Sequence, residues 1–465
     1  MSPAPAIVYY GDDFTGATDT LGTAARAGLR ALLFLKTPDA ARLAQAGPLD
    51  VLGIAGAARA MAPDAMQAEL APVGALFRAL GARVLHYKTC STFDSAPDIG
   101  SIGAAVRALR GAVEQPWTAI VGGQPNLGRH CLFGNLFAAA GAGGEVFRID
   151  RHPTMSRHPV TPMHEADLRL HLANQGLADM RSIPFTVVSQ GPEVLGEALR
   201  RTWHAPFADG DETGAVLFDV ADAPQLAAIG QVLWAQARRA TLLAVGPSSV
   251  VDALATALGA RSNAKAEQRP VAPARGPVLV LAGSLSPVTA RQVAAAQSFD
   301  VVWLDAPKLA QRNAATLERH AQEIAHALIR GCNVLACTRP AGRDVTEFML
   351  DAQALARAGG DLLAKVLAKV PLQRVGIAGG DTSSHAVQAL DAWGLSYVAD
   401  MGAGASLCRV HSDNPALDGM EIMLKGGQMG SEDAFERLVH GADAIAELKT
   451  SQLSFGACVT ELPNK

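Results

Sequence analysis

Short apolar runs alternate with alanine- and leucine-rich stretches of helical periodicity along most of the chain. This alternation predicts layers of helices on largely parallel sheets. In the first half the predicted strands are Ile7–Tyr10, Leu32–Leu35, Val51–Ile54, Val84–Tyr87 and Ala119–Val121, and the predicted helices are Ala17–Ala27 and Pro63–Leu80. The intervening GDDFTGATD is expected to form the turn after the first strand, and Gly28 is expected to follow the helix at its C′ position.

The alternation breaks at RSNAKAEQRPVAPARGP, which has three prolines, several charges and almost no bulky apolar residue. Such a composition is typical of a linker. We therefore predict two α/β domains, each with a mainly parallel sheet flanked by helices, at residues 1–260 and 278–465, with the linker at 261–277. The predicted strands of the second domain are Val278–Ala282, Val301–Leu304, Val334–Ala336, Val375–Ala378 and Ile422–Leu424, and the tail Thr450–Lys465 is expected to be peripheral.

Composition narrows the class of protein. The 465 residues include 40 Lys+Arg against 44 Asp+Glu, and aromatic residues make up only 5%, so a basic, stacking face for nucleic acid is not expected. The amino terminus lacks the features of a secretory signal, and no apolar stretch is long enough to predict a membrane span. Six cysteines without metal-ligand spacing are typical of free thiols in a reducing compartment, which predicts a cytoplasmic protein.

Polar residues follow the predicted strands of the first half. They are Asp12 and Asp13 after the first strand, Arg59 after the third, and Lys88, Ser91, Thr92 and Asp94 after the fourth. Because ligands of open parallel sheets lie beyond the carboxyl ends of the strands, these side chains would line a pocket for a polar substrate if the strands are neighbours. Taken alone, the two aspartates could equally cap a helix, and Arg59 and Lys88 could be surface charges.

Three glycine-rich turns follow strands in the second half. They are Gly283-Ser284, Gly379-Gly380-Asp381-Thr382 and Lys425-Gly426-Gly427. Such turns expose backbone N–H groups toward an anion, and glycine lets a phosphate approach closely, so they predict a phosphate site. The sequence contains neither GxGxxG after a strand nor GxxxxGK[ST], so a bound nucleotide would lie in another kind of cradle.

Four histidines, His152, His158, His164 and His171, invite a metal hypothesis. Their spacing is broken by prolines and matches no known ligand pattern, so no metal site is predicted, and a loop that closes over substrate is the favoured interpretation. Cys90 has no evident base beside it and is expected to be a packed thiol.

The motifs GDDFTGATD, KTCSTFDSAPDIGSIG, HPVTPMHEADL, LAGSLSPVT, AGGDTSSHAVQALD and LKGGQMG, in this order, resemble the four-carbon acid sugar kinase family from Tyr9 to about Leu438. The resemblance implies an enzyme that phosphorylates threonate, erythronate or 3-oxo-tetronate with ATP. It also implies an N-terminal domain for the sugar acid, a C-terminal domain for the nucleotide and an active site in the cleft between them.

Matched residue by residue, the resemblance gives Asp12, Asp13, Ser91, Thr92 and Asp94 to the substrate side. Its nucleotide side would comprise Ser284, Gly379, Gly380, Asp381, Thr382 and Gly427. Where the family commonly has Ser-Arg this chain has Ala58-Arg59, so only the arginine carries over. The chain has KTCSTFDS where threonate and erythronate kinases have the DSTLRG form, which favours the 3-oxo-tetronate-like branch. The stretch SAPDIGSIG differs from the form of that branch's typical members, so a related branched or longer 3-oxo acid stays open as the substrate.

These residues suggest a mechanism of phosphoryl transfer. Asp13, with Asp12 as the competing candidate, would accept the proton of the terminal hydroxyl, while Arg59 and Lys88 would hold the carboxylate or the transferring phosphate. The glycine turns would hold ATP and Mg²⁺, with Asp381 a candidate ligand through water. A homodimer is one expectation for the assembly. The alternatives from other classes are a non-catalytic nucleotide-sensing protein and a metal-dependent aldolase or hydrolase of sugar acids.

Overall fold

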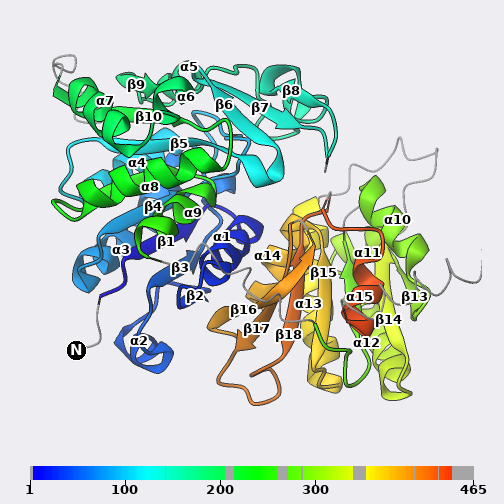
Figure 1. Ribbon diagram of the computed structural model, residues 1–465. Helices are drawn as coiled ribbons and strands as arrows, with labels where there is room; N and C mark the ends of the chain where they lie inside the picture. The colour runs from blue at the N-terminus through cyan, green and yellow to red at the C-terminus, as the bar shows by residue number, and fades with distance from the viewer. Residues whose placement is uncertain are drawn as a thin grey trace, which may run out of the picture. The chain divides into compact units, whose positions relative to one another are not determined.

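The computed structural model describes residues 4–141, 143–204, 214–259, 271–283, 286–338, 352–402, 404–427 and 429–441. The chain forms two compact units, one of Met1–Glu267 with Trp393–Tyr397 and one of Gln268–Ala392 with Val398–Lys465. Each unit contains a mainly parallel sheet flanked by helices, which confirms the predicted fold class (Figure 1). Most of the predicted linker, 261–270, and the tail 450–465 lie outside the described residues.

The sheet of the first unit has parallel strands in the order β2 (Ala31–Phe34), β3 (Val51–Ala55), β1 (Ile7–Gly11), β4 (Val84–Lys88), β11 (Leu242–Gly246), β5 (Thr118–Gln124), β10 (Ala215–Asp219) and β9 (Met180–Ile183). An antiparallel extension of β6 (Arg129–Leu132), β7 (Asn135–Ala139) and β8 (Val146–Arg148) continues from β5. All strands predicted for this half are present. The strands from β6 to β11 were not predicted from the sequence.

The helices of this unit are α1 (Phe14–Arg26), α2 (Ala40–Ala46), α3 (Pro63–Leu80), α4 (Ile102–Arg110), α5 (Leu168–Ala173), α6 (Phe185–Val188), α7 (Pro192–His204), α8 (Pro224–Ala237) and α9 (Ser249–Ala257). The contacts of Tyr9 and Tyr10, neighbours on β1, show that helices cover both faces of the sheet. The Tyr9 hydroxyl donates to the Ala17 carbonyl of α1 at 2.9 Å, and the Tyr10 hydroxyl donates to Glu69 of α3 at 3.1 Å. Since successive strand residues point to opposite faces, α1 and α3 lie on opposite sides.

The first helix corrects one prediction. GDDFTGATD was expected to be a turn, but α1 already begins at Phe14, so only Asp12 and Asp13 separate it from the strand. The helix begins there because the Asp13 side chain caps it, accepting a hydrogen bond from the Gly16 N–H at 3.0 Å. At the other end Gly28 follows the C-cap with φ of 82°, as predicted.

The sheet of the second unit has parallel strands in the order β13 (Phe299–Leu304), β14 (Asn333–Thr338), β12 (Leu279–Ala282), β15 (Arg374–Ala378) and β18 (Glu421–Lys425), and β17 (Ala405–His411) joins β18 antiparallel. The flanking helices are α10 (Pro287–Ala295), α11 (Ala306–Ala310), α12 (Ala314–Ile329), α13 (Ala352–Lys369), α14 (Gly380–Ala389) and α15 (Ala434–His440). Strand β16 (Gly394–Gly402) begins in the first unit, where Gly394 and Leu395 pair with β2.

Both sheets reverse their strand order beside the first strand of the unit. In the first unit, β2 and β3 lie on one side of β1 and β4 lies on the other. In the second unit, β13 and β14 lie on one side of β12 and β15 lies on the other. At such a reversal the connections leave in opposite directions and open a crevice at the carboxyl ends of the strands. Among the described residues, no helix combines the length and apolar character that crossing a bilayer requires.

Candidate active site

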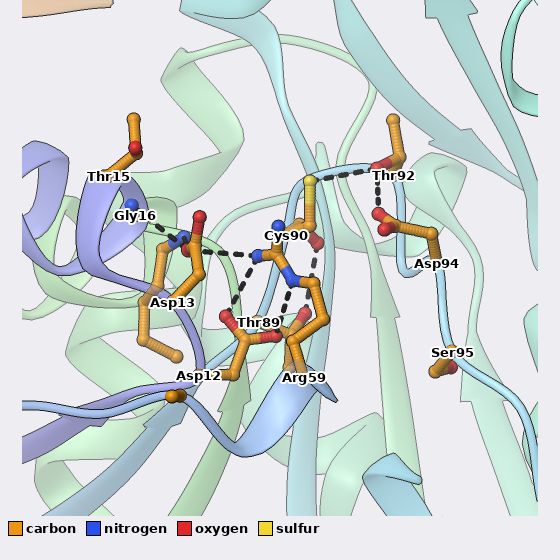
Figure 2. Close-up of polar contacts among 12 residues, drawn as sticks. Asp12, Asp13, Thr15, Gly16, Arg59, Thr89, Cys90, Thr92, Asp94 and Ser95 are labelled. Carbon is orange, nitrogen blue, oxygen red and sulfur yellow. Dashed lines mark hydrogen bonds and ion pairs between the residues drawn. The ribbon is translucent and has the colours of Figure 1, made fainter. Parts of the chain in front are cut away.

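The carboxyl edge of the first unit's sheet brings together residues that are far apart in the sequence. Strand β1 lies between β3 and β4, so Gly11 stands level with Ala55 on one side and with Lys88 on the other. The residues that follow these positions therefore meet at one edge of the sheet. Figure 2 shows Asp12, Asp13 and Arg59 in direct contact there.

Arg59 is the centre of this cluster. It lies in a short 3₁₀ turn, Ala58–Ala60, where its backbone N–H donates to the Asp12 carbonyl at 3.0 Å. Its guanidinium binds both oxygens of Asp12, at 2.9 and 3.3 Å, and also lies 2.9 Å from an oxygen of Asp13. The planar guanidinium group can serve two carboxylates at once, which an ammonium group cannot do with the same geometry.

The two aspartates differ in protonation behaviour although they are adjacent. Burial raises the pKa of Asp12, although the Arg59 charge opposes this, and its side chain is only 6% exposed. Burial acts in the same direction on Asp13, but the charges of Arg59 and Lys88 outweigh it and lower the pKa of that carboxyl. Asp13 is also the more accessible of the two, at 25% exposed, so it is an ionised carboxylate within reach of a ligand.

Asp13 combines the two interpretations that the sequence left open. It caps α1, and it also takes part in the charged cluster, with the Lys88 ammonium 3.9 Å away. Gly16 makes this arrangement sterically feasible. A Cβ atom there would lie 1.9 Å from Lys88 Nζ and 2.4 Å from an Asp13 oxygen, so the first turn of α1 leaves space only for these functional groups.

The loop after β4 contains the other predicted substrate residues. The Thr92 hydroxyl contacts both Asp94 and the Cys90 sulfur, and all three side chains are visible in Figure 2. Ser91, Thr92 and Asp94 are buried, and Asp94 is 3.5 Å from the Thr161 hydroxyl. The Cys90 thiol has a pKa raised by burial and by Asp94, which agrees with a packed thiol rather than a nucleophile.

The second unit places the three glycine turns side by side. Ala282, Ala378 and Lys425 are level on the neighbouring strands β12, β15 and β18, and each is followed by glycine. Gly283 approaches α14 so closely that a Cβ atom would lie 2.3 Å from the Thr382 hydroxyl. Gly379 adopts a φ of 128°, which favours glycine.

Of the predicted nucleotide residues, Gly379, Gly380, Thr382 and Gly427 therefore lie in one cluster. Gly427 is anchored to α10, because its carbonyl accepts hydrogen bonds from the Ser286 hydroxyl and, at 2.9 Å, from the Thr289 hydroxyl. Ser284 and the side chain of Asp381 are outside the described part of the structure.

Lys425 was quoted in a motif but was not predicted as a site residue. It is fully buried, and its ammonium donates to the Gly426 carbonyl at 3.0 Å and to the Thr289 hydroxyl at 3.4 Å. Within the described residues no carboxylate pairs with it, and burial lowers its pKa to about 8. A buried cation with only neutral partners is costly, which is typical of a site that receives an anion. Its place directly before two glycines was the signal in the sequence.

The histidines do not gather into a metal site. His152 accepts from the backbone N–H groups of Thr154 and Met155, and His171 contacts the Ser95 hydroxyl at 3.0 Å. His158 organises its own turn in the same way as His152. The described parts of the chain contain no group of histidine, cysteine or acidic residues arranged to hold a metal ion. The segment is held by local hydrogen bonds and by hydrogen bonds to the loop after β4. The predicted closing loop stays a prediction.

Comparisons with known proteins agree with this geometry. Residues 7–254 match the family described as sugar-binding N-terminal domain, and residues 279–435 match the nucleotide-binding C-terminal domain. A 3-oxo-isoapionate kinase of Paraburkholderia graminis is 38% identical over 94% of each chain. A 3-oxo-tetronate kinase of Methylobacterium radiotolerans is 29% identical and covers 92% of this chain and 96% of its own.

Solved structures show the same fold. One from Salmonella typhimurium LT2 superposes with a TM-score of 0.75 at 23% identity and covers 93% of this chain and 98% of its own. One from Haemophilus influenzae has a TM-score of 0.69 at the same identity and covers 92% and 98%. From the domain matches, the relatives and the two polar clusters, we conclude that the chain belongs to the four-carbon acid sugar kinase family and is an ATP-dependent sugar-acid kinase.

Proposed function

We propose that the enzyme transfers the γ-phosphate of ATP to the terminal hydroxyl of a small 3-oxo sugar acid. The relatives named above act on 3-oxo-isoapionate and 3-oxo-tetronate, and the higher identity, 38% against 29%, favours the former or a close analogue over 3-oxo-tetronate itself. The observation that carries the proposal is the cluster of Asp12, Asp13, Arg59 and Lys88, because it offers both cations for an acid and an ionised carboxylate for a hydroxyl.

We assign the role of general base to Asp13. A carboxylate whose pKa is lowered is ionised at neutral pH and can accept the proton as the hydroxyl attacks. Asp12 is the more deeply buried partner and uses both oxygens to hold Arg59, which makes it a positioning residue. Arg59 and Lys88 would bind the carboxylate of the substrate or the transferring phosphoryl group, since both carry positive charge at this edge of the sheet.

On the nucleotide side, the three glycine turns would present backbone N–H groups to the phosphates of ATP, with Lys425 supplying charge beneath them. Magnesium enters this proposal as the companion of ATP, which it binds chiefly through phosphate oxygens. The proposed water-mediated ligand Asp381 lies in the first turn of α14, but its side chain is outside the described residues, so we assign no step to the ion. The homodimer and the cytoplasmic location stay predictions.

Substrate choice is tested by ADP release over a panel of acids. We expect turnover with 3-oxo-isoapionate or 3-oxo-tetronate that depends on both ATP and the acid. Threonate and erythronate should be poorer by about tenfold or more, since they carry a hydroxyl where a 3-oxo acid carries a carbonyl, and a mismatched hydrogen-bonding group in a built site costs at least this much. ADP release that does not depend on any acid would contradict the kinase, and preference for threonate or erythronate would contradict the 3-oxo substrate class.

The base is tested with Asp13→Asn. Asparagine caps a helix as well as aspartate does, so this change keeps α1 intact and removes only the carboxylate. We expect kcat to fall about a hundredfold or more. Asp39 offers a matched control because it caps α2 through the Arg42 N–H at 2.9 Å, away from the cluster. Asp39→Asn should leave kcat unchanged, and normal turnover by Asp13→Asn would move the base to another carboxylate.

A further inference from the structure

The loop after β4 contains an uncommon backbone conformation. Phe93 adopts a φ of 53° although its side chain is bulky and fully buried. Left-handed backbone of this kind is strained for a residue other than glycine, and it persists only where the surrounding structure holds it in place. Residues in such conformations gather at functional sites. The contacts that hold Phe93 are therefore of functional interest.

The reversal of the backbone at Phe93 brings together the side chains on either side of it. The Thr92 hydroxyl donates to the Asp94 carboxylate, and both side chains are labelled in Figure 2. Asp94 is only 5% exposed, and its other described donor is the Thr161 hydroxyl at 3.5 Å. A buried carboxylate whose donors are neutral hydroxyls can accept a further hydrogen bond, for example from a hydroxyl of the sugar acid.

Asp94 belongs electrostatically to the charged cluster at the carboxyl edge of the sheet. Burial acts against it, but the carboxylates of Asp12, Asp13 and Asp94 raise the pKa of Arg59. The position of Asp94 therefore affects the group that we assign to the binding of the acid.

Two side chains reach the carbonyl of Phe93. The Ser95 hydroxyl donates to it at 2.9 Å, and Nε2 of His171 lies 3.1 Å from it. The amide nitrogen of Gln175 joins these two side chains, since it donates to the Ser95 hydroxyl at 2.8 Å and lies 3.1 Å from Nε2 of His171. The amide oxygen of Gln175 accepts from the N–H of Ile102, the first residue of α4, at 2.8 Å. This network ties the loop to α4 and α5.

The network is shielded from solvent. Ser95, His171 and Gln175 are 3%, 9% and 4% exposed. Burial lowers the pKa of His171, so its ring is neutral and acts as a hydrogen-bonding group rather than as a charge. Buried polar groups that satisfy one another make a structure locally rigid. The network can therefore hold Phe93 in its strained conformation.

We propose that His171 is a positioning residue for the sugar-acid site. Together with Ser95 and Gln175 it holds the backbone of Phe93, and through this backbone it sets the direction of the Asp94 carboxylate. The inference rests on the proposed function, because it assumes that Asp94 contacts the acid. It gives a role to a histidine to which neither the motifs nor the family matches assign one.

The test replaces His171 and follows KM for each substrate separately, with the acid preferred in the panel above. His171→Leu removes the ring nitrogens and keeps the position apolar and filled. We expect KM for the acid to rise about tenfold or more, because Asp94 is misdirected, while KM for ATP stays within about twofold. His171→Gln offers an amide nitrogen in place of Nε2 and should keep KM for the acid within about threefold of the wild type.

The matched control is His152→Leu. His152 is buried in the same segment at 5% exposed, and its Nδ1 accepts from the N–H groups of Thr154 and Met155. Nε2 of His152 lies 3.4 Å from the Ala139 carbonyl of β7 rather than beside the loop after β4. The control should lower Tm, as His171→Leu does, but leave KM for the acid unchanged. This difference separates a loss of positioning from a loss of stability.

Two further variants make the test independent of how well His171→Leu folds. Ser95→Ala removes the O–H donor to the Phe93 carbonyl and should raise KM for the acid about threefold or more. Asp94→Asn should raise KM for the acid by itself. Adding His171→Leu to Asp94→Asn should then raise it little further, since a positioning residue acts through the group that it positions.

An unchanged KM for the acid in Ser95→Ala and in folded His171→Leu would overturn the inference and leave the kinase intact. An equal rise in KM for ATP and for the acid, or an unchanged KM for the acid in Asp94→Asn, would overturn it in the same way. If His171→Leu does not fold, Ser95→Ala alone decides. A wild-type enzyme that releases no ADP with any acid would instead overturn the proposed function.

Discussion

Replacing Lys425 by methionine is expected to stabilise the protein without nucleotide and to weaken its binding of nucleotide. The change keeps the length of the side chain and removes a charge that is fully buried among neutral partners. Burial lowers the pKa of the lysine from 10.5 to about 8. Because one pKa unit corresponds to about 1.4 kcal/mol, keeping this group protonated in the folded state costs about 3 kcal/mol at neutral pH.

Part of this cost is offset by hydrogen bonds. The ammonium donates to the Gly426 carbonyl and the Thr289 hydroxyl, and each such bond contributes about 1 kcal/mol. We therefore expect Lys425→Met to raise the stability of the nucleotide-free protein by about 1 kcal/mol at pH 7, measured as an increase in Tm. Binding of ADP should weaken by about tenfold to a hundredfold, since the lost bond to phosphate is charge-assisted.

The dependence on pH has a definite sign. Below pH 8 the lysine is protonated in both folded and unfolded states, so the full burial cost is present. Between pH 8 and 10.5 the unfolded chain binds a proton that the folded protein does not, so wild-type stability rises with pH relative to the methionine variant. The affinity of the wild type for ADP should fall as pH rises above about 8, and the affinity of the variant should be weak and independent of pH there.

The assay is thermal unfolding at pH 7 and pH 9, with and without ADP. Ligand that binds only the folded protein raises Tm, so the shift caused by ADP reports affinity in the same experiment. A variant that is less stable than wild type at pH 7 without nucleotide, and that gains the same shift from ADP, would refute the reasoning. Lys425 would then be a structural donor that supports the turn.

Three substitutions test the steric and charged contacts at the two clusters. Gly16→Ala places a Cβ atom 1.9 Å from Lys88 Nζ, so kcat/KM should fall about a hundredfold. Tm should change little, because the end of the lysine side chain can move and alanine favours the helix. A large loss of Tm would contradict this. Arg59→Lys cannot bridge both aspartates and should raise KM for the acid about tenfold in steady-state kinetics, with KM for ATP unchanged. Gly283→Ala pushes against the Thr382 hydroxyl and should raise KM for ATP alone; an equal rise for the acid would count against separate sites.

Local pattern was enough to predict much of this molecule. Runs such as Ile7–Tyr10 and Val375–Ala378 are strands because four apolar residues in a row, bounded by polar or glycine turns, can be buried on both faces of a parallel sheet. The acids after the first strand and the glycines after β12, β15 and β18 could be predicted as site residues from the same pattern. Polar or flexible residues are expected where a buried strand ends. Motif order then indicated the family.

Which strands are neighbours was decided only by the tertiary structure. Arg59 reaches Asp12 across 47 positions because β3 pairs with β1, and strand pairing depends on long-range packing that no local period records. Strands β9 to β11 and the short antiparallel extension were not predicted, although they are as short as strands that were, and pairing with their neighbours is what identifies them as strands.

The sequence by itself therefore determined the kind of chemistry, through the identity of the residues at the strand ends. The tertiary structure decided their electrostatic state. Adjacent Asp12 and Asp13 have the same unperturbed pKa. Their pKa values separate because of unequal burial, the positions of Arg59 and Lys88, and the hydrogen bond that the Gly16 N–H donates to Asp13. In the same way Lys425 is an ordinary lysine in the sequence, and its lowered pKa arises because the fold removes it from water without giving it a carboxylate among the described residues.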